Sequence, residues 1–243
     1  MGLEKRPLIA VPVMEKKEED IIEAFRRLIE MEVDIIEWRA DCFLDIADEK
    51  KVERILSNAP SNLLFTIRTE AEGGYFSGSD EDYYSLLHLA SRTKRPKIID
   101  IELQKALKEP DLSALFQDIH ENSTRVLVSY HDFTRTPSFE EMEDILYSMK
   151  NCGADIAKLA VTAQNEEEAL RLLSLSESFT RQNPDIDTVT ISMGPFGILS
   201  RTGCFLTRSY ITFAAEDRER ASAPGQLTYD EMKTVLSIFE RNQ

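Results

Sequence analysis

Residues 126–161 read VLVSYHDFTRTPSFEEMEDILYSMKNCGADIAKLAV and contain one complete structural repeat. The stretch opens with a β-branched, apolar run over residues 126–130 and closes with a second one over residues 154–161. Between them, residues 139–146 place apolar side chains at helical spacing. A strand, a helix and a second strand in this order predict two parallel strands that are joined by a helical crossover.

The same alternation continues through the whole chain. Short apolar or β-branched runs occur at residues 8–13, 34–38, 63–67, 97–101, 126–130, 154–161, 187–193 and 209–214. Amphipathic segments such as residues 21–29 lie between them, and residues 229–240 predict a final helix. Successive strand ends are between 20 residues (Met193 to Phe213) and 35 residues (Lys158 to Met193) apart. Eight such units in 243 residues predict an α/β protein with a single (β/α)8 TIM barrel.

An open, doubly wound sheet is the alternative architecture. The motif G-x-G-x-x-G is absent after the first predicted strand, which removes the usual dinucleotide-binding interpretation of that fold. No linker rich in Gly, Pro or Ser divides the chain, so we expect one catalytic domain over residues 1–243. The seventh unit is the weakest, because residues 194–197 lead into only a short helical stretch.

The composition excludes several classes of partner. Hydrophobic residues make up 42% and charged residues 30% of the chain, as in soluble globular proteins. The formal net charge of −15 argues against nucleic acid and against an anionic membrane surface. The apolar run at residues 8–14 is too short for a signal peptide or a membrane span, so we expect a cytoplasmic protein. The 3 cysteines are widely spaced, which predicts reduced thiols.

Charged side chains gather where the predicted strands end. They are Glu37, Arg39, Arg68, Asp100, Glu102, His131 and Lys158. The C-terminal ends of barrel strands form the active-site face, so these residues predict a functional rim. Arginines gathered there would attract a small anion even though the chain is acidic. Because Glu37 and Arg39 lie two residues apart on one strand face, an internal ion pair is an equal alternative for them.

Lys158 has the clearest chemistry of these residues. An ammonium group inside an apolar run is costly unless it is paired or the amine is neutral. A neutral lysine amine can attack a ketone. His131 ends the preceding predicted strand, and an imidazole titrates near neutral pH. The pair indicates imine chemistry assisted by proton transfer, while an exposed edge lysine and a core histidine are the structural alternatives.

Several sequence blocks together resemble the type I 3-dehydroquinate dehydratases. They are EWRAD at residues 37–41, TIRTEAEGG at 66–74, SYHDF at 129–133, AKLA at 157–160, SMG at 192–194 and the segment 197–201. The blocks cover essentially the whole chain in the order of that family. The resemblance implies a lyase of the shikimate pathway, in aromatic amino acid biosynthesis, that dehydrates 3-dehydroquinate to 3-dehydroshikimate.

The resemblance also implies the catalytic residues. Lys158 would form an imine, or Schiff base, with the C3 ketone of the substrate, which makes the neighbouring C2 proton removable. His131 would take that proton and later protonate the departing C1 hydroxyl. Glu72 matches the carboxylate that orients this histidine. The scheme requires neither a metal nor an organic cofactor.

The substrate-binding residues follow from the same resemblance. Arg201 matches the clamp for the substrate carboxylate, since a guanidinium suits bidentate contact with that group. Ser222 and Gln226 match the neutral partners of this clamp. Glu37, Arg39 and Arg68 match the residues that hold the ring hydroxyls. Met193 matches an apolar contact to the substrate. Residues 215–227 would form a loop that closes over the substrate.

Two other functions stay open beside this one. A class I aldolase-type barrel enzyme also uses a lysine imine, and a non-catalytic barrel could simply bind a hydroxy acid. The small-molecule substrate distinguishes the aldolase from the dehydratase. A dehydratase converts 3-dehydroquinate to a conjugated enone and does not turn over aldol substrates. For the assembly, the resemblance suggests a homodimer.

Overall fold

The computed structural model describes residues 6–220 and 226–241. Contacts group the chain into two compact units, of which one consists of residues 12–128. The other consists of residues 1–11 together with residues 129–243. A single domain over residues 1–243 therefore stays a prediction.

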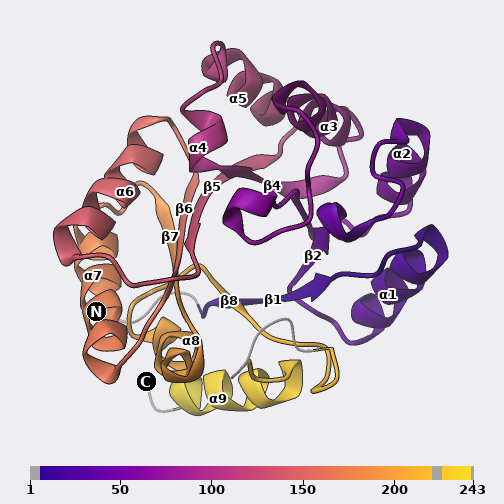
Figure 1. The fold of residues 1–243 in the computed structure, drawn as a ribbon. Helices are drawn as coiled ribbons and strands as arrows, with labels where there is room; N and C mark the ends of the chain where they lie inside the picture. Colours follow the sequence, from indigo (N-terminus) through magenta and orange to yellow (C-terminus); the bar gives the residue numbers. More distant parts are fainter. Residues whose placement is uncertain (1–5, 221–225, 242–243) are drawn as a thin grey trace. The chain divides into compact units, whose positions relative to one another are not determined.

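The unit of residues 12–128 alternates strands and helices in the predicted way (Figure 1). Its elements are α1 (Glu18–Glu30), β2 (Ile35–Arg39), α2 (Glu49–Ser57), β3 (Leu63–Thr66), α3 (Asp80–Arg92), β4 (Pro96–Glu102), α4 (Leu103–Ala106) and α5 (Leu112–Glu121). Short 3₁₀ turns, η1 (Ala40–Cys42) and η2 (Glu70–Glu72), follow β2 and β3. β2 pairs in parallel with β3, and β3 pairs in parallel with β4. This is the pairing that helical crossovers produce.

The core of this unit shows why polar strand residues face away from the helices. Trp38 in β2 is fully buried, and its ring lies 6.4 Å from that of Phe25 in α1. It also packs against Phe65 of β3 at a centroid distance of 5.5 Å. Successive side chains of a strand point to opposite faces. The neighbours of Trp38, Glu37 and Arg39, are therefore directed to the other side of the sheet.

The second unit repeats the same alternation. Its elements are α6 (Phe139–Asn151), β6 (Ile156–Thr162), α7 (Glu166–Gln182), β7 (Asp187–Met193), η3 (Pro195–Gly197), α8 (Ile198–Thr202), η4 (Gly203–Phe205), β8 (Ile211–Phe213) and α9 (Tyr229–Arg241). β6 pairs in parallel with β7. β1 (Leu8–Val13) pairs in parallel with β8 through its first three residues. β5 (Arg125–Asp132) contributes its last four residues to this unit.

The described chain confirms the predicted α/β class, with eight parallel strands and interleaved helices. No strand boundary differs from its prediction by more than two residues. The seventh unit is indeed the weakest, since α8 has only 5 residues. After β4 the crossover is divided into α4 and α5, because Pro110 lies between them and cannot continue a helix.

Two further predictions concern membrane spans and the state of the cysteines. None of the described helices combines the length and the apolar character that crossing a membrane requires. Cys42, Cys152 and Cys204 are free. Burial raises the pKa of the Cys42 and Cys204 thiols to about 12, so both stay neutral at physiological pH.

Candidate active site

The end of β2 carries Glu37 and Arg39, and both are held by polar neighbours. Glu37 is buried, and its Oε1 accepts a hydrogen bond of 3.0 Å from Thr66 Oγ1 at the end of β3. Arg39 donates from Nε and Nη2 to the two carboxylate oxygens of Asp41, each at 2.8 Å. These two bonds form an ion pair between Arg39 and Asp41, which lies in η1.

Arg68 lies just beyond β3 at the centre of a buried group of carboxylates. Its Nη2 is 2.6 Å from Asp100 Oδ2, and its Nη1 is 3.2 Å from Glu102 Oε1 and 3.5 Å from Glu72 Oε2. Burial would lower the pKa of the Arg68 guanidinium, but the charges of Asp100, Glu102 and Glu72 raise it above its ordinary value. Arg68 is therefore a permanently charged and well-compensated cation.

Glu72 lies in a tight loop that closes on the end of β3. Phe76 N donates to Arg68 O at 3.1 Å, which brings the two stems of the loop together. The turn passes through Gly73 at φ 76°, a conformation that glycine adopts without strain. A Cβ on Gly74 would lie 2.0 Å from Arg68 O, so only glycine fits there. These glycines fix the placement of Glu72, which is only 5% exposed.

In the second unit, Lys158 is buried in the middle of β6 and is 4% exposed. Its Nζ lies 4.5 Å from the ring centroid of Phe213, at the end of β8. A ring face at this distance attracts a cation. The burial of Lys158 that its apolar flanks predict is confirmed.

His131 lies near the end of β5 and is partly exposed. Its ring stacks on that of Phe133, with a centroid distance of 6.4 Å and an angle of 16°. The next residue, Asp132, accepts hydrogen bonds from Thr134 N at 2.8 Å and Arg135 N at 3.1 Å. Asp132 therefore holds the turn that follows β5, directly after His131.

Arg201 is a second buried guanidinium, 5% exposed, in α8. Its Nη1 donates to Phe213 O at 3.2 Å. Within residues 6–220 and 226–241, no carboxylate forms an ion pair with it. Burial lowers the pKa of Arg201 to about 10. A buried cation that lacks an anionic partner is a ready site for a carboxylate ligand.

The position of α8 depends on close packing against β7. A Cβ on Gly197 would lie 2.0 Å from Ser192 O. Ser192 N donates to Ser200 Oγ at 2.9 Å, which fastens α8 to the strand end. Met193 ends β7 and is partly exposed.

Two predicted binding residues, Ser222 and Gln226, belong to the segment 215–227. Gln226 is described and half-buried. Ser222 lies outside the described residues, as does the middle of the loop predicted over residues 215–227.

Two residues in these surroundings are missed by sequence reasoning alone. Asp41 holds Arg39, and Phe213 contacts both Lys158 and Arg201. Asp41 stands two residues after a strand that already carries charged residues, which is a weak signal. Phe213 gives no chemical signal because its side chain is apolar. Among the described residues, no group of His, Cys, Asp and Glu has the arrangement of a metal site.

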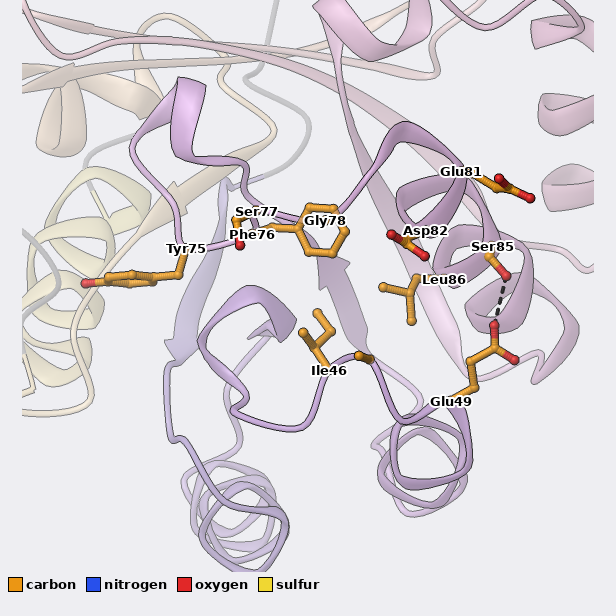
Figure 2. Close-up of a pocket in the computed structure, with 11 residues that line it drawn as sticks. Ile46, Glu49, Tyr75, Phe76, Ser77, Gly78, Glu81, Asp82, Ser85 and Leu86 are labelled. Carbon is orange, nitrogen blue, oxygen red and sulfur yellow. Dashed lines mark hydrogen bonds between the residues drawn. The ribbon is translucent and has the colours of Figure 1, made fainter.

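A cavity of about 420 Å³ lies in the unit of residues 12–128. Figure 2 shows Ile46, Phe76 and Leu86 on its apolar side and the 2.9 Å hydrogen bond from Ser85 to Glu49 at its edge. No predicted site residue lines this cavity.

The sequence comparisons point to one family. A model described as type I 3-dehydroquinase matches residues 9–243. A 3-dehydroquinate dehydratase of Listeria monocytogenes serotype 4a is 34% identical over 243 residues, covering 98% of this chain and 94% of that protein. One of Bacillus licheniformis is 35% identical over 246 residues with the same coverage.

Solved structures agree with this result. A type I 3-dehydroquinate dehydratase from Clostridium difficile, crystallised with covalently modified comenic acid, has a TM-score of 0.89 at 33% identity. The match covers 99% of this chain and 95% of that one. The fold is therefore a (β/α)8 TIM barrel, as predicted, and the open doubly wound sheet is excluded.

Proposed function

Because this chain belongs to the type I 3-dehydroquinase family, we propose that it dehydrates 3-dehydroquinate to 3-dehydroshikimate through a Schiff base on Lys158. The chain is a hydro-lyase, since both the family and the relatives are dehydratases. The reaction belongs to the shikimate pathway of aromatic amino acid biosynthesis. The observation that carries the proposal is the burial of the Lys158 amine on β6 against the ring of Phe213.

In the proposed first step, Lys158 Nζ attacks the C3 carbonyl of the substrate, and one water leaves as the protonated imine forms. The imine nitrogen then accepts the electron pair of the C2–H bond when His131 removes that proton. The enamine returns its electrons as the C1 hydroxyl departs, protonated by His131. Hydrolysis of the imine by another water releases the product and restores the Lys158 amine.

The surroundings of Lys158 support the imine step. A protonated imine is a cation, as is the lysine ammonium, so the ring of Phe213 can stabilise both. His131 at the partly exposed end of β5 can exchange its proton with solvent. In the scheme Glu72 orients His131, and the tight glycine loop limits the movement of this carboxylate.

Substrate binding is assigned to the other predicted residues. Arg201 takes the substrate carboxylate, which would supply the anionic partner that no described residue provides. Glu37, Arg39 and Arg68 hold the ring hydroxyls. Met193 gives an apolar contact, and the neutral partners of the carboxylate are Ser222 and Gln226.

The proposed scheme uses no metal and no organic cofactor. We further propose that the protein acts in the cytoplasm as a homodimer, without nucleic-acid or membrane partners. The net charge of −15 supports the exclusion of polyanionic partners. Light scattering of the purified protein tests the dimer directly.

The reaction is tested by following ultraviolet absorbance after 3-dehydroquinate is added to the purified chain. A conjugated enone should appear with the wild-type protein and with the control variant Lys97→Ala, whose lysine is exposed on β4. Aldol substrates should not turn over. Cleavage of an aldol substrate without enone formation would favour an aldolase, and no turnover of either would favour a binding protein.

A further inference from the structure

Asp41 is a buried carboxylate to which the proposed function assigns no role. It lies in η1, immediately after β2, and its side chain has 0% exposure. Its two oxygens accept hydrogen bonds from Arg39 Nε and Nη2, both at 2.8 Å. This is the bidentate geometry in which an arginine and a carboxylate bind most strongly and fix each other's orientation.

The same carboxylate also holds the loop that carries Glu72. Arg68 N donates to Asp41 Oδ1 at 3.2 Å, and Tyr75 N donates to Oδ2 at 3.1 Å. These two residues are the stems of the loop, on either side of Glu72. Each oxygen of Asp41 thus accepts one bond from Arg39 and one from the loop backbone.

The charge of Asp41 matters as well as its shape. Burial would lower the pKa of Arg39, but the hydrogen bonds and charge of Asp41 raise it above its ordinary value. An asparagine at this position would replace one of the two oxygens with an NH2 group. That group cannot accept the hydrogen bond from Arg39 or the one from the loop backbone. Either orientation of the amide therefore breaks one contact on each side.

We propose that Asp41 is a positioning residue that sets the Arg39 guanidinium and the Glu72 loop together. Substrate binding by Arg39 and the chemistry that depends on Glu72 are then coupled through one carboxylate. The inference rests on the proposed function, because its effect is read through the dehydration reaction.

The test is the steady-state kinetics of Asp41→Asn, Arg39→Ala, Glu72→Gln and the two double variants that contain Asp41→Asn. Asp41→Asn should raise KM and lower kcat, each by about tenfold, as expected for lost bonds to charged groups. In the Arg39→Ala background the change in KM should disappear, because Asp41 then has no guanidinium to place. In the Glu72→Gln background the change in kcat should largely disappear for the same reason.

A purely structural role gives a different result. Partial unfolding lowers the active fraction, so it reduces kcat and leaves KM unchanged. The matched control is Asp48→Asn, which keeps a good N-cap for α2 and should leave both constants unchanged. If Asp41→Asn does not fold, the variant Arg39→Lys is measured in its place. A lysine cannot make the bidentate contact with Asp41, and the bonds from Asp41 to the loop backbone are kept. This variant should raise KM without lowering kcat.

An unchanged KM in Asp41→Asn or in Arg39→Lys, or additive effects in both double variants, overturns the positioning role. If the wild-type chain dehydrates 3-dehydroquinate normally in that experiment, the proposed function stands. A wild-type chain with no turnover overturns both.

Discussion

Arg68 and Arg201 are both buried guanidiniums, yet the two units surround them in opposite ways. In the unit of residues 12–128, Arg68 contacts Asp100, Glu102 and Glu72 within 3.5 Å. In the other unit, Arg201 donates to the carbonyl of Phe213, and no described carboxylate pairs with it. The pKa of Arg68 is accordingly raised and that of Arg201 is lowered.

The two arginines differ in whether carboxylates of the described chain compensate their charge. Arg68 is neutralised by its own protein, so its position does not depend on a ligand. Among the described residues no carboxylate compensates the buried charge of Arg201, which a carboxylate ligand can neutralise. Lys158 lies in the same unit as Arg201, with an aromatic ring beside its amine. We infer that the protein itself fixes Arg68, whereas Arg201 is placed to receive a carboxylate ligand.

The largest effect that this comparison predicts is the loss of the reactive amine. Lys158→Met should abolish essentially all turnover, because no imine can form, while the substrate still binds. Enone absorbance measures the turnover, and calorimetric titration measures the binding. If Lys158→Met kept as much activity as a His131 variant, Lys158 would not be the nucleophile.

His131→Ala should lower kcat by roughly 10²–10⁴-fold, the usual contribution of general acid–base catalysis. Because Lys158 is intact, the variant should still form the imine, which borohydride reduction would trap. Stopped-flow absorbance gives the rate of each step. A variant that turns over normally would assign proton transfer to another group.

Arg68→Met should destabilise the fold by about 3–5 kcal/mol, since it leaves buried carboxylates without their cation. Urea unfolding measures the free energy of unfolding of the variant. The control Arg92→Met removes an exposed arginine from α3 and should change stability by less than about 0.5 kcal/mol. A loss as small as that of the control would show that the network is not compensated as described.

Arg201→Met should have the opposite sign and stabilise the ligand-free protein by about 1–3 kcal/mol, because it removes a buried charge and, among the described residues, leaves no carboxylate without its cation; only the hydrogen bond to the Phe213 carbonyl is lost. Tm should rise by about 2–4 °C for each kcal/mol in a chain of this size. KM for the substrate should rise at the same time. Destabilisation similar to that of Arg68→Met would remove the distinction between the two arginines.

The pH dependence of this gain follows from the lowered pKa of Arg201. Its folded value is about 10, below the ordinary value of an arginine. Between these values the unfolded chain binds more protons, so the stability of the wild-type protein rises with pH in that interval. The cost of burial is fully present below pH about 10. The Tm difference between Arg201→Met and wild type should therefore be constant near neutral pH and shrink above about 10.

The smallest predicted effect concerns Phe213. Phe213→Leu removes the ring near Lys158 but keeps the carbonyl that accepts from Arg201. Relative to the neutral amine that attacks the ketone, the protonated imine loses a cation–π contact of about 0.5–2 kcal/mol, which should slow imine formation by roughly 2- to 30-fold. Rapid-quench borohydride trapping measures this rate, and KM should change little. An unchanged trapping rate would show that the ring does not stabilise the cation.

The sequence predicts the fold well because local patterns carry it. Apolar runs such as residues 187–193 mark their own strands, and β7 has these bounds. The burial of Lys158 is readable for the same reason, since its strand neighbours are apolar. The end of that strand is less readable, because it is predicted at Lys158 whereas β6 continues to Thr162.

Long-range contacts are what the sequence pattern does not contain. Asp41 contacts Tyr75 N, 34 residues away, and nothing in either segment specifies that bond. The close approach of Gly197 to Ser192 O and the surroundings of Arg201, where no described carboxylate pairs with the guanidinium, also come from packing. Such features depend on where distant segments meet, so only the structure reveals them.

The proposed reaction depends on condensation of the Lys158 amine with the substrate ketone. Borohydride reduction in the presence of 3-dehydroquinate, followed by peptide mass spectrometry, tests it most directly. We expect a stable adduct on the peptide that contains Lys158, absent without substrate and absent in Lys158→Met. A chain that dehydrates the substrate while Lys158 stays unmodified, or that carries the adduct on another lysine, would contradict it.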